Sequence, residues 1–430
     1  MIKVVQGDRQ TCQSFVEDLK SRVGQASPEI EQTVRDVIEQ VRAGGDSAVK
    51  AFSEKFDGWT PENLELSREA LEQAVAECDP AFIQSLRKAA ENIRAFHTRQ
   101  VHKDFVITEH AGIVMGQRYT PIARVGICVP RSPVAFPSSV LMNAIPARIA
   151  GVEEIFMVTS PDKTGAISPE ALAAAKVAGV DRIFKVGGAQ GVAALAYGTE
   201  TIPAVDKIVG PGGVFVAAAK RKVFGLVGID MVAGPSEILV LADGGCDARC
   251  VAADMLSQAE HDTHAAAVLV TDSESLARAV AAELERQLAI LPRREIAQKS
   301  LEDNGRIIVT ESLEAAVEAA NQLAPEHLEL CVAEPFALLP RVRNAGSIFL
   351  GRSAPEALGD YFAGPNHTLP TGGTARFSSP LSVDDFVKKS SFLYYTREAL
   401  GKAAPRIADF ARREGLEAHA RSVLSRSEDV

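Results

Sequence analysis

Over the first hundred residues, apolar side chains recur every three or four positions, which is the spacing of one face of an α-helix. The pattern predicts four helices, at 28–43, 47–56, 68–77 and 80–100. Gly44 and Gly45 end the first of these helices, and Asp46 is a suitable N-cap for the second. The chain therefore begins with a helical region.

From Phe105 the apolar period shortens to two, which is typical of β-strands. Strands are predicted at 106–109, 113–119 and 125–129. Strands and helices then alternate, with strands at 155–159, 182–186 and 207–209 and helices at 138–150, 169–178, 192–197 and 214–224. Strand, short turn and helix in repetition predict a parallel, doubly wound sheet.

A second α/β unit follows Gly234-Pro-Ser-Glu237. Its predicted strands lie at 238–241, 266–271, 306–309, 328–332 and 347–350, with helices between them. A loop-rich stretch covers 352–382, and helices are predicted at 383–388, 397–414 and 416–426. The expected fold class is α/β, with two Rossmann-like doubly wound domains and helical extensions at the N- and C-terminal ends.

Charge and composition narrow the possible partners. The 430 residues carry a formal net charge of −10, so nucleic acid, which needs a basic surface, is a poor candidate. We expect no signal peptide and no membrane span, because no apolar run approaches the required ~18–20 residues. Six cysteines in so long a chain do not resemble a disulfide framework, and a cytoplasmic location is expected.

Two glycine-rich turns open helices in the first sheet. Gly187-Gly-Ala-Gln-Gly191 precedes one helix and Gly210-Pro-Gly-Gly213 precedes another. Helix N-termini after such turns present free N–H groups to phosphates. Neither turn is a complete G-x-G-x-x-G, and each is also explained as a tight strand–helix turn. Two of them in one sheet, beside the 129–133 loop, favour a ligand.

Gln258 and His261 lie three residues apart at the end of a helix predicted at 247–261, so their side chains leave one face. An amide oxygen and an imidazole nitrogen form half of a divalent metal site. The alternative is that both residues cap the helix end. Five of the eight histidines lie after residue 260 and are accompanied by acidic residues, which favours one composite site.

Several longer motifs, taken together and in order, resemble the histidinol dehydrogenase family over essentially the whole chain. These motifs are Gly-Pro-Ser-Glu237, Leu-Ser-Gln-Ala-Glu-His261, Ala-Pro-Glu-His-Leu-Glu329, Gly-Asp-Tyr361, Gly-Pro-Asn-His-Thr-Leu-Pro370, Ala-Arg-Phe-Ser-Ser379 and Glu-Gly-Leu-Glu-Ala-His-Ala-Arg421. The resemblance implies oxidation of L-histidinol through L-histidinal to L-histidine with two NAD. It also implies one Zn²⁺ per site and an intertwined, domain-swapped homodimer.

The resemblance assigns roles to single residues. It implies that the acid–base pair is Glu326, which activates water, and His327, which takes the alcohol proton. The implied zinc ligands are Gln258, His261, Asp360 and His419, the last from the partner subunit. The implied substrate contacts are Ser236, His367 and Glu414, together with His327 and the four metal ligands. The implied cofactor contacts lie at Cys128, Gln190 and Gly213.

The cofactor loops depart from the family pattern. Cys128-Val-Pro-Arg-Ser132 stands where the family usually has tyrosine followed by Val-Pro-Gly-Gly, and Gly213 stands where it has asparagine. Arg131 is hypothesised to offer a cation to a phosphate and to shift the preference from NAD toward NADP. The alternative is that Arg131 is a solvated loop residue.

We expect four segments along the chain. They are an N-terminal helical extension at 1–24, a first α/β domain at 25–127 plus 238–380, a second, dinucleotide-side domain at 128–237, and a C-terminal helical tail at 381–430 that reaches the partner subunit. The rival interpretation is a related dehydrogenase of another polar alcohol. A non-catalytic zinc or dinucleotide-binding protein is disfavoured because Glu326 and His327 are both present.

Overall fold

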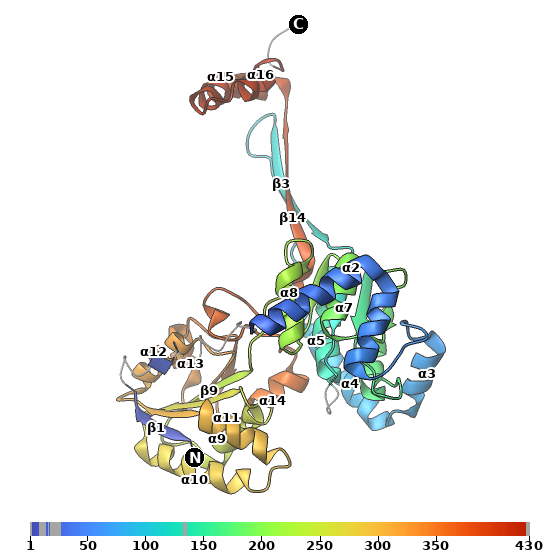
Figure 1. The fold of residues 1–430 in the computed structure, drawn as a ribbon. Helices are drawn as coiled ribbons and strands as arrows, with labels where there is room; N and C mark the ends of the chain where they lie inside the picture. Colours follow the sequence, from blue (N-terminus) through green and yellow to red (C-terminus); the bar gives the residue numbers. More distant parts are fainter. Residues whose placement is uncertain (1, 8–13, 16, 18–26, 132–135, 427–430) are drawn as a thin grey trace. The chain divides into compact units, whose positions relative to one another are not determined.

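The computed structural model describes residues 2–7, 14, 15, 17, 27–131 and 136–426, and these form two compact units (Figure 1). Unit 1 comprises the described residues of Met1–Gln100 and Ala123–Phe386, and unit 2 those of Val101–Ile122 and Val387–Val430. No helix in the described part of the chain is both long enough and apolar enough to cross a membrane.

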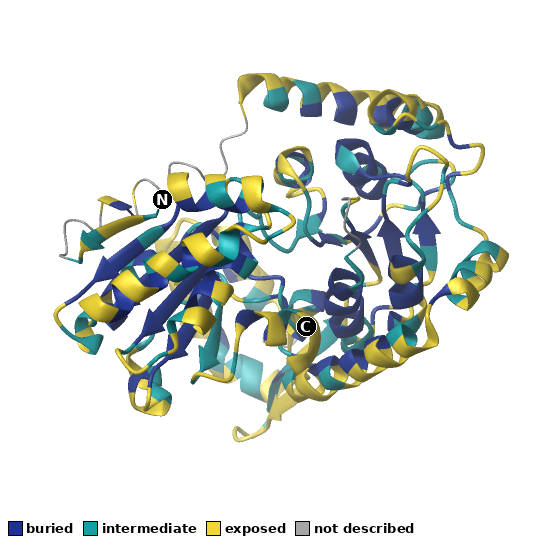
Figure 2. Ribbon diagram, turned by 90° about the horizontal axis from the view of Figure 1, so that it is seen from below, coloured by how far each residue is buried: buried dark blue, intermediate teal, exposed yellow. Residues whose placement is uncertain are grey.

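A six-stranded parallel sheet forms the larger core of unit 1. Its strand order is β1-β11-β10-β9-β12-β13. The bounds are β1 Lys3–Gln6, β9 Glu237–Ala242, β10 Ala266–Thr271, β11 Arg306–Val309, β12 His327–Cys331 and β13 Ser347–Leu350. The central strands are dark blue in Figure 2 because helices cover both of their faces.

Alternate residues of each strand supply the two faces of this sheet. Ile238 and Val240 of β9 contact one group of helices, and Leu239 and Leu241 contact the other. The first group is α9 Ala248–Ala259, α10 Glu274–Leu288 and α11 Arg294–Asp303. The second is α12 Leu313–Leu323 and α13 Pro335–Leu338. The prediction of a second α/β unit is thereby confirmed.

A five-stranded parallel sheet forms the other core of unit 1, in the order β6-β5-β4-β7-β8. The bounds are β4 Arg124–Cys128, β5 Glu154–Val158, β6 Arg182–Phe184, β7 Lys207–Val209 and β8 Gly228–Ile229. The helices between them are α5 Pro137–Ala150, α6 Pro169–Ala178, α7 Gly188–Tyr197 and α8 Val214–Val223. The strand order reverses between β4 and β7, the point at which doubly wound sheets open a ligand crevice.

The N-terminal helices contact the helices of this five-stranded sheet. They are α2 Pro28–Asp57, α3 Arg68–Glu77 and α4 Pro80–His97. α2 packs on α7 and α8, α3 on α6, and α4 on α5. The predicted domain division groups 25–127 with 238–380 instead. The domain boundaries stay a prediction, but apolar residues of α2 share a core with the five-stranded sheet.

Two sequence-based expectations concern the start of the chain, and the second of them is corrected. The helices predicted at 28–43 and 47–56 form one element, α2, and the predicted break between them is confirmed by a kink at Gly45, whose φ of 53° and ψ of −136° are not helical. In the predicted N-terminal helical extension, residues 3–6 form β1, which pairs with β11; Ser14, Phe15 and Glu17 are helical. The remaining residues of 8–26 lie outside the described part.

Unit 2 contains an antiparallel sheet in the order β14-β3-β2 and two helices. The bounds are β2 Phe105–Ile107, β3 Ile113–Pro121, β14 Val387–Tyr395, α15 Arg397–Arg413 and α16 Glu417–Leu424. The helix predicted at 383–388 is wrong, because β14 begins at Val387 after a single 3-10 turn at Val383–Phe386. All nine residues of β14 pair with β3, and this ladder outweighs local helical tendency.

Candidate active site

The predicted acid–base pair lies at the start of β12, where one residue of the neighbouring strand holds both side chains. The backbone N–H of Glu237 donates to Glu326 Oε2 at 2.8 Å. The backbone carbonyl of Glu237 accepts from His327 Nδ1 at 2.9 Å. Because a carbonyl oxygen can only accept, Nδ1 carries the hydrogen, and the lone pair of the neutral ring is on Nε2.

The chain enters β12 through a strained turn. Ala324 ends α12 with φ 50°, and it is the one non-glycine residue with positive φ among those that the structure describes. A left-handed alanine costs about 1–2 kcal/mol. Backbone strain of this kind concentrates at functional sites. Here the strained turn immediately precedes Pro325, Glu326 and His327.

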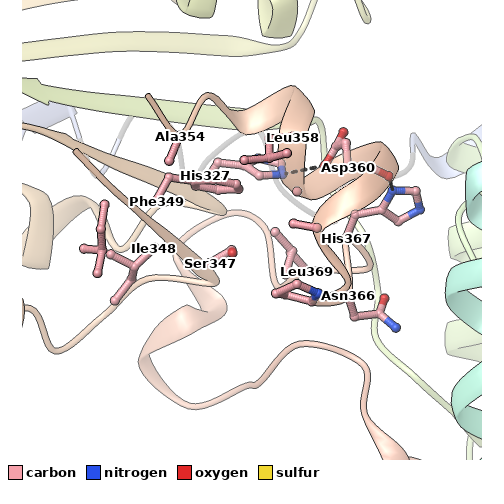
Figure 3. A pocket seen from close by; sticks show the side chains of 14 residues that line it. His327, Ser347, Ile348, Phe349, Ala354, Leu358, Asp360, Asn366, His367 and Leu369 are labelled. Carbon is pink, nitrogen blue, oxygen red and sulfur yellow. Dashed lines mark hydrogen bonds and ion pairs between the residues drawn. The ribbon is translucent and has the colours of Figure 1, made fainter. Parts of the chain in front are cut away.

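His327 Nε2 faces a group of carboxylates. It lies 3.6 Å from Asp360 Oδ1 and 4.0 Å from Glu356 Oε1. The atom is buried and has no hydrogen-bond partner within the described ranges. His327, Asp360 and His367 line a cavity of about 300 Å³. Figure 3 shows His327 and Asp360 facing each other. Nε2 is thus the free proton acceptor of the pair.

Burial and charge oppose each other at Glu326 and His327. Burial raises the pKa of Glu326 to about 8. Burial lowers the pKa of His327, but the carboxylates of Glu326, Asp360 and Glu356 outweigh it and raise that pKa to about 10. A protonated Glu326 carries no charge to hold a proton on His327, so the two shifts are not present in full together. Burial disfavours the Glu326 carboxylate, so Glu326 is protonated over much of the neutral pH range and leaves His327 without that negative charge.

Gln258 provides the clearest sign of a missing ligand. It lies in the last turn of α9, is 1% exposed, and its Oε1 has no hydrogen-bond partner among the residues with described positions. Leaving such an oxygen buried and unpaired costs about 1–3 kcal/mol. An amide oxygen of this kind is satisfied by a metal ion or a polar ligand.

His261 follows α9 and is electrostatically linked to the same group. Its backbone N–H donates to the carbonyl of Gln258 at 3.1 Å. Burial of the ring lowers the pKa of His261. The charge of His327 also lowers this pKa, whereas the carboxylate of Asp360 raises it. The residue as a whole nevertheless reaches the surface. The imidazole is therefore in electrostatic range of Asp360 and His327 and favours its neutral, metal-binding form.

Asp360 lies in the π-helical turn η3 Gly359–Ala363, which follows the short helix α14 Glu356–Leu358. π-turns are frequent at functional sites. Burial raises the pKa of Asp360, but its interactions with His327 and His367 prevail and lower that pKa to about 2. His367 Nδ1 donates to the Asp360 carbonyl at 3.0 Å, and its Nε2 lies 3.3 Å from Ser139 Oγ. Asp360 is therefore ionised, as a metal ligand must be.

The remaining substrate-side positions divide between the two units. Ser236 lies directly before β9, next to the residue that holds the acid–base pair. Glu414 and His419 belong to unit 2, where they line an open groove on α15 and α16 together with exposed Phe410 and Leu416. Unit 1 thus contains Gln258, His261, Glu326, His327, Asp360 and His367, and it does not contain Glu414 or His419.

The three predicted cofactor positions follow strands of the five-stranded sheet. Cys128 ends β4 and is buried, which raises the pKa of its thiol to about 12, so it stays protonated. Gln190 lies in the first turn of α7 and is 2% exposed. Gly213 is the N-cap of α8, and a Cβ placed there would meet no atom within 4 Å. The asparagine of the family pattern would therefore fit at Gly213.

Arg131 is already engaged within the protein. Arg131 is exposed, and its Nη1 donates to the carbonyl of Pro161 at 2.5 Å. Its positive charge favours the ionised forms of Asp57 and Asp162, but hydrogen bonds from Thr164 and Ala166 lower the pKa of Asp162 more, and burial raises the pKa of Asp57 overall. The rest of this loop, including Ser132 and Pro133, lies outside the described residues.

Sequence reasoning missed two acidic residues. Glu237 is buried, its pKa is raised to about 7 by burial, and its Oε1 accepts from Gly372 N at 3.0 Å. Glu356 is also buried, and its Oε2 accepts from Ser257 Oγ at 2.8 Å. Glu356 and Asp360 are four residues apart, a spacing that places two side chains on one helical face and was the available signal. The role of the Glu237 backbone left no signal in the sequence.

The similarity to known proteins extends over nearly the whole chain. A family model described as histidinol dehydrogenase matches residues 20–427. Histidinol dehydrogenase of Geobacillus kaustophilus is 54% identical over 410 residues, which is 95% of this chain and 97% of the relative. That of Bacillus subtilis is 52% identical over 412 residues, 96% of each chain. The crystal structure of histidinol dehydrogenase from Elizabethkingia anophelis has a TM-score of 0.93 and 36% identity, and covers 99% of this chain and 98% of its own.

Proposed function

This chain belongs to the histidinol dehydrogenase family, and from that premise we propose that it oxidises L-histidinol through L-histidinal to L-histidine with two NAD. It is an oxidoreductase of histidine biosynthesis. The observation that carries the proposal is the unpaired Gln258 Oε1, buried in the same unit as an acid–imidazole pair whose Nε2 is also unpaired.

We propose that Gln258, His261 and Asp360, with the partner subunit's His419, hold Zn²⁺. The donor set fits, because it consists of an orphaned amide oxygen, an imidazole whose pKa is lowered by burial, and a carboxylate whose pKa is about 2. When bound there, Zn²⁺ supplies a Lewis acid that anchors the imidazole and amine of the substrate without accepting electrons. The remaining substrate contacts in this proposal are Ser236, His367 and Glu414.

His327 is proposed as the base of the first oxidation. Its Nδ1–H is held by Glu237, so the Nε2 lone pair is directed away from that bond and is available to the substrate hydroxyl. Nε2 takes the hydroxyl proton as a hydride leaves the alcohol carbon. NAD supplies the hydride acceptor in both oxidations. The products of this step are histidinal, NADH and one proton.

Glu326 is proposed to act on water in the second stage. The aldehyde has to add water before it can lose another hydride, and burial gives Glu326 a pKa near the operating pH of a general base. Its ionised form takes a proton from water as the oxygen adds to the aldehyde carbon, and the aldehyde oxygen takes the proton that His327 Nε2 gained in the first oxidation. The hydrate then loses a hydride to the second NAD, and a hydroxyl proton passes to His327 Nε2. The carboxylate product is L-histidine.

The proposed dinucleotide site is the crevice between β4 and β7. Cys128, Gln190 and Gly213 border it at the carboxyl ends of the strands or in the helix turns that follow. We propose NAD as the coenzyme because the Arg131 guanidinium already donates to the carbonyl of Pro161 and lies near the carboxylates of Asp57 and Asp162, so it is not left free for a 2′-phosphate. We also propose an intertwined homodimer that works in the cytoplasm, since each site needs the partner subunit's His419.

The test is absorbance at 340 nm with purified protein and L-histidinol, with NAD and NADP in parallel. We expect two NADH per L-histidinol, loss of the signal after chelation, and its return when Zn²⁺ is added. A panel of other polar alcohols serves as the specificity control. NADH formation from another alcohol with none from L-histidinol would overturn the proposal.

A further inference from the structure

A buried ion pair lies behind the second glycine-rich turn. Lys220 of α8 pairs with Asp230, which follows β8, and their side chains are 3% and 1% exposed. Most other ion pairs in the described chain lie at the surface, with both side chains well exposed. A buried ion pair is often no more stabilising than apolar side chains of the same volume. Its position therefore calls for an explanation other than stability.

Both members of the pair bind the same residue of the turn. The backbone N–H of Gly210 donates to Asp230 Oδ2 at 2.7 Å, and Lys220 Nζ donates to the carbonyl of Gly210 at 3.0 Å. The second carboxylate oxygen of Asp230 accepts from the N–H of Met231 at 2.6 Å. The two charges thus fix the donor and the acceptor of one residue, and with them its orientation.

Gly210 is the point at which the turn meets the first strand of the sheet. Its φ is +101°, and a Cβ there would lie 2.3 Å from the carbonyl oxygen of Cys128 at the end of β4. The turn therefore lies against the crevice between β4 and β7. It ends at Gly213, which caps α8 without a side-chain hydrogen bond. The orientation of Gly210 sets the path of the turn toward the first N–H groups of α8.

We propose that Lys220 and Asp230 are positioning residues that hold the 210–213 turn in the conformation that receives the dinucleotide. This inference rests on the proposed function, because it assumes that the crevice between β4 and β7 binds NAD. Neither residue needs to touch the coenzyme. Both act through the backbone of Gly210.

The test measures NADH binding by nicotinamide fluorescence in the zinc-loaded protein, without L-histidinol. The variants are Lys220→Met, Asp230→Asn and the double variant, which leaves no unpaired buried charge. Lys222→Met is the matched control, because Lys222 lies on the same helix but pairs with Glu31. We expect the double variant to raise the Kd for NADH and the KM for NAD about tenfold or more. Zinc content, KM for L-histidinol and the control variant should stay within about twofold of wild type.

Two outcomes would overturn the inference, and they differ from failure of the proposed function. One is a folded double variant that keeps the wild-type Kd for NADH and only has a lower melting temperature. This result would mean that the ion pair has a purely structural role. The other is an equal loss of NADH binding in Lys222→Met. If the single variants do not fold, the Kd of the double variant for NADH decides whether the inference holds. If the wild-type protein itself binds no NADH, the proposed function fails and this inference fails with it.

Discussion

Replacing Gln258 with methionine should change stability in opposite directions with and without zinc. Gln258 Oε1 is buried and unpaired among the described residues. Methionine keeps the length of the side chain and removes the polar atoms. In the metal-free protein the change removes a desolvation cost. In the zinc-loaded protein it removes a ligand.

The size of each effect follows from the burial of this one oxygen. An unpaired buried polar atom costs about 1–3 kcal/mol, so the metal-free variant should be more stable than wild type by about that amount. At free zinc of about 100 times the Kd, binding stabilises the wild type by about 2.7 kcal/mol. A site weakened about a hundredfold by ligand loss would gain only about 0.4 kcal/mol at the same zinc concentration.

The assay is urea unfolding after chelation, repeated at fixed free zinc, with zinc content measured alongside. Gln73→Met is the control, since Gln73 is exposed on α3 and its replacement should change the free energy of unfolding by less than about 0.5 kcal/mol. A Gln258→Met protein that is less stable than wild type without metal, or that gains as much from zinc as wild type does, would refute the reasoning.

Four further predictions concern the same site. His327→Asn should keep its zinc and lower kcat by about 10²–10⁴, whereas His264→Asn, an exposed histidine, should leave kcat unchanged. Because burial lowers the pKa of His261 from its ordinary 6.5, zinc content should hold through pH 7 and fall only on acidification below 6.5; loss already above pH 7 would contradict this. Mixed refolding of His261→Asn and His419→Asn chains should recover about a quarter of wild-type activity. No recovery of activity would contradict this prediction, because it would mean that each chain builds its own site. Arg131→Ala should leave the preference for NAD over NADP unchanged in steady-state rates, because its guanidinium already donates to the carbonyl of Pro161.

The residues that were predictable from sequence are those whose signal is local. The apolar spacing of α9 predicted the helix, and the helix predicted that the side chains of Gln258 and His261 leave one face. Strand β14 could not be found this way, because most of its residues are exposed and it lacks the alternation of a half-buried strand. Its pairing partner β3 lies far away in sequence. The site residues after position 320 were assigned by family resemblance rather than by spacing.

The acid–base pair shows why the chemistry of this fold could not be read from side chains alone. Parallel pairing of β9 with β12 places His327 opposite Ile238, and this register brings the peptide groups of Glu237 to both members of the pair. A slip of the register would move both contacts at once. The atoms that fix the tautomer of His327 and hold Glu326 are backbone atoms, which every residue possesses. The buried apolar sequence of β9 decides which backbone atoms reach the pair, because its alternate side chains lock the strand between two layers of helices. The hydrophobic pattern of β9 therefore determines which nitrogen of His327 is available to take a proton.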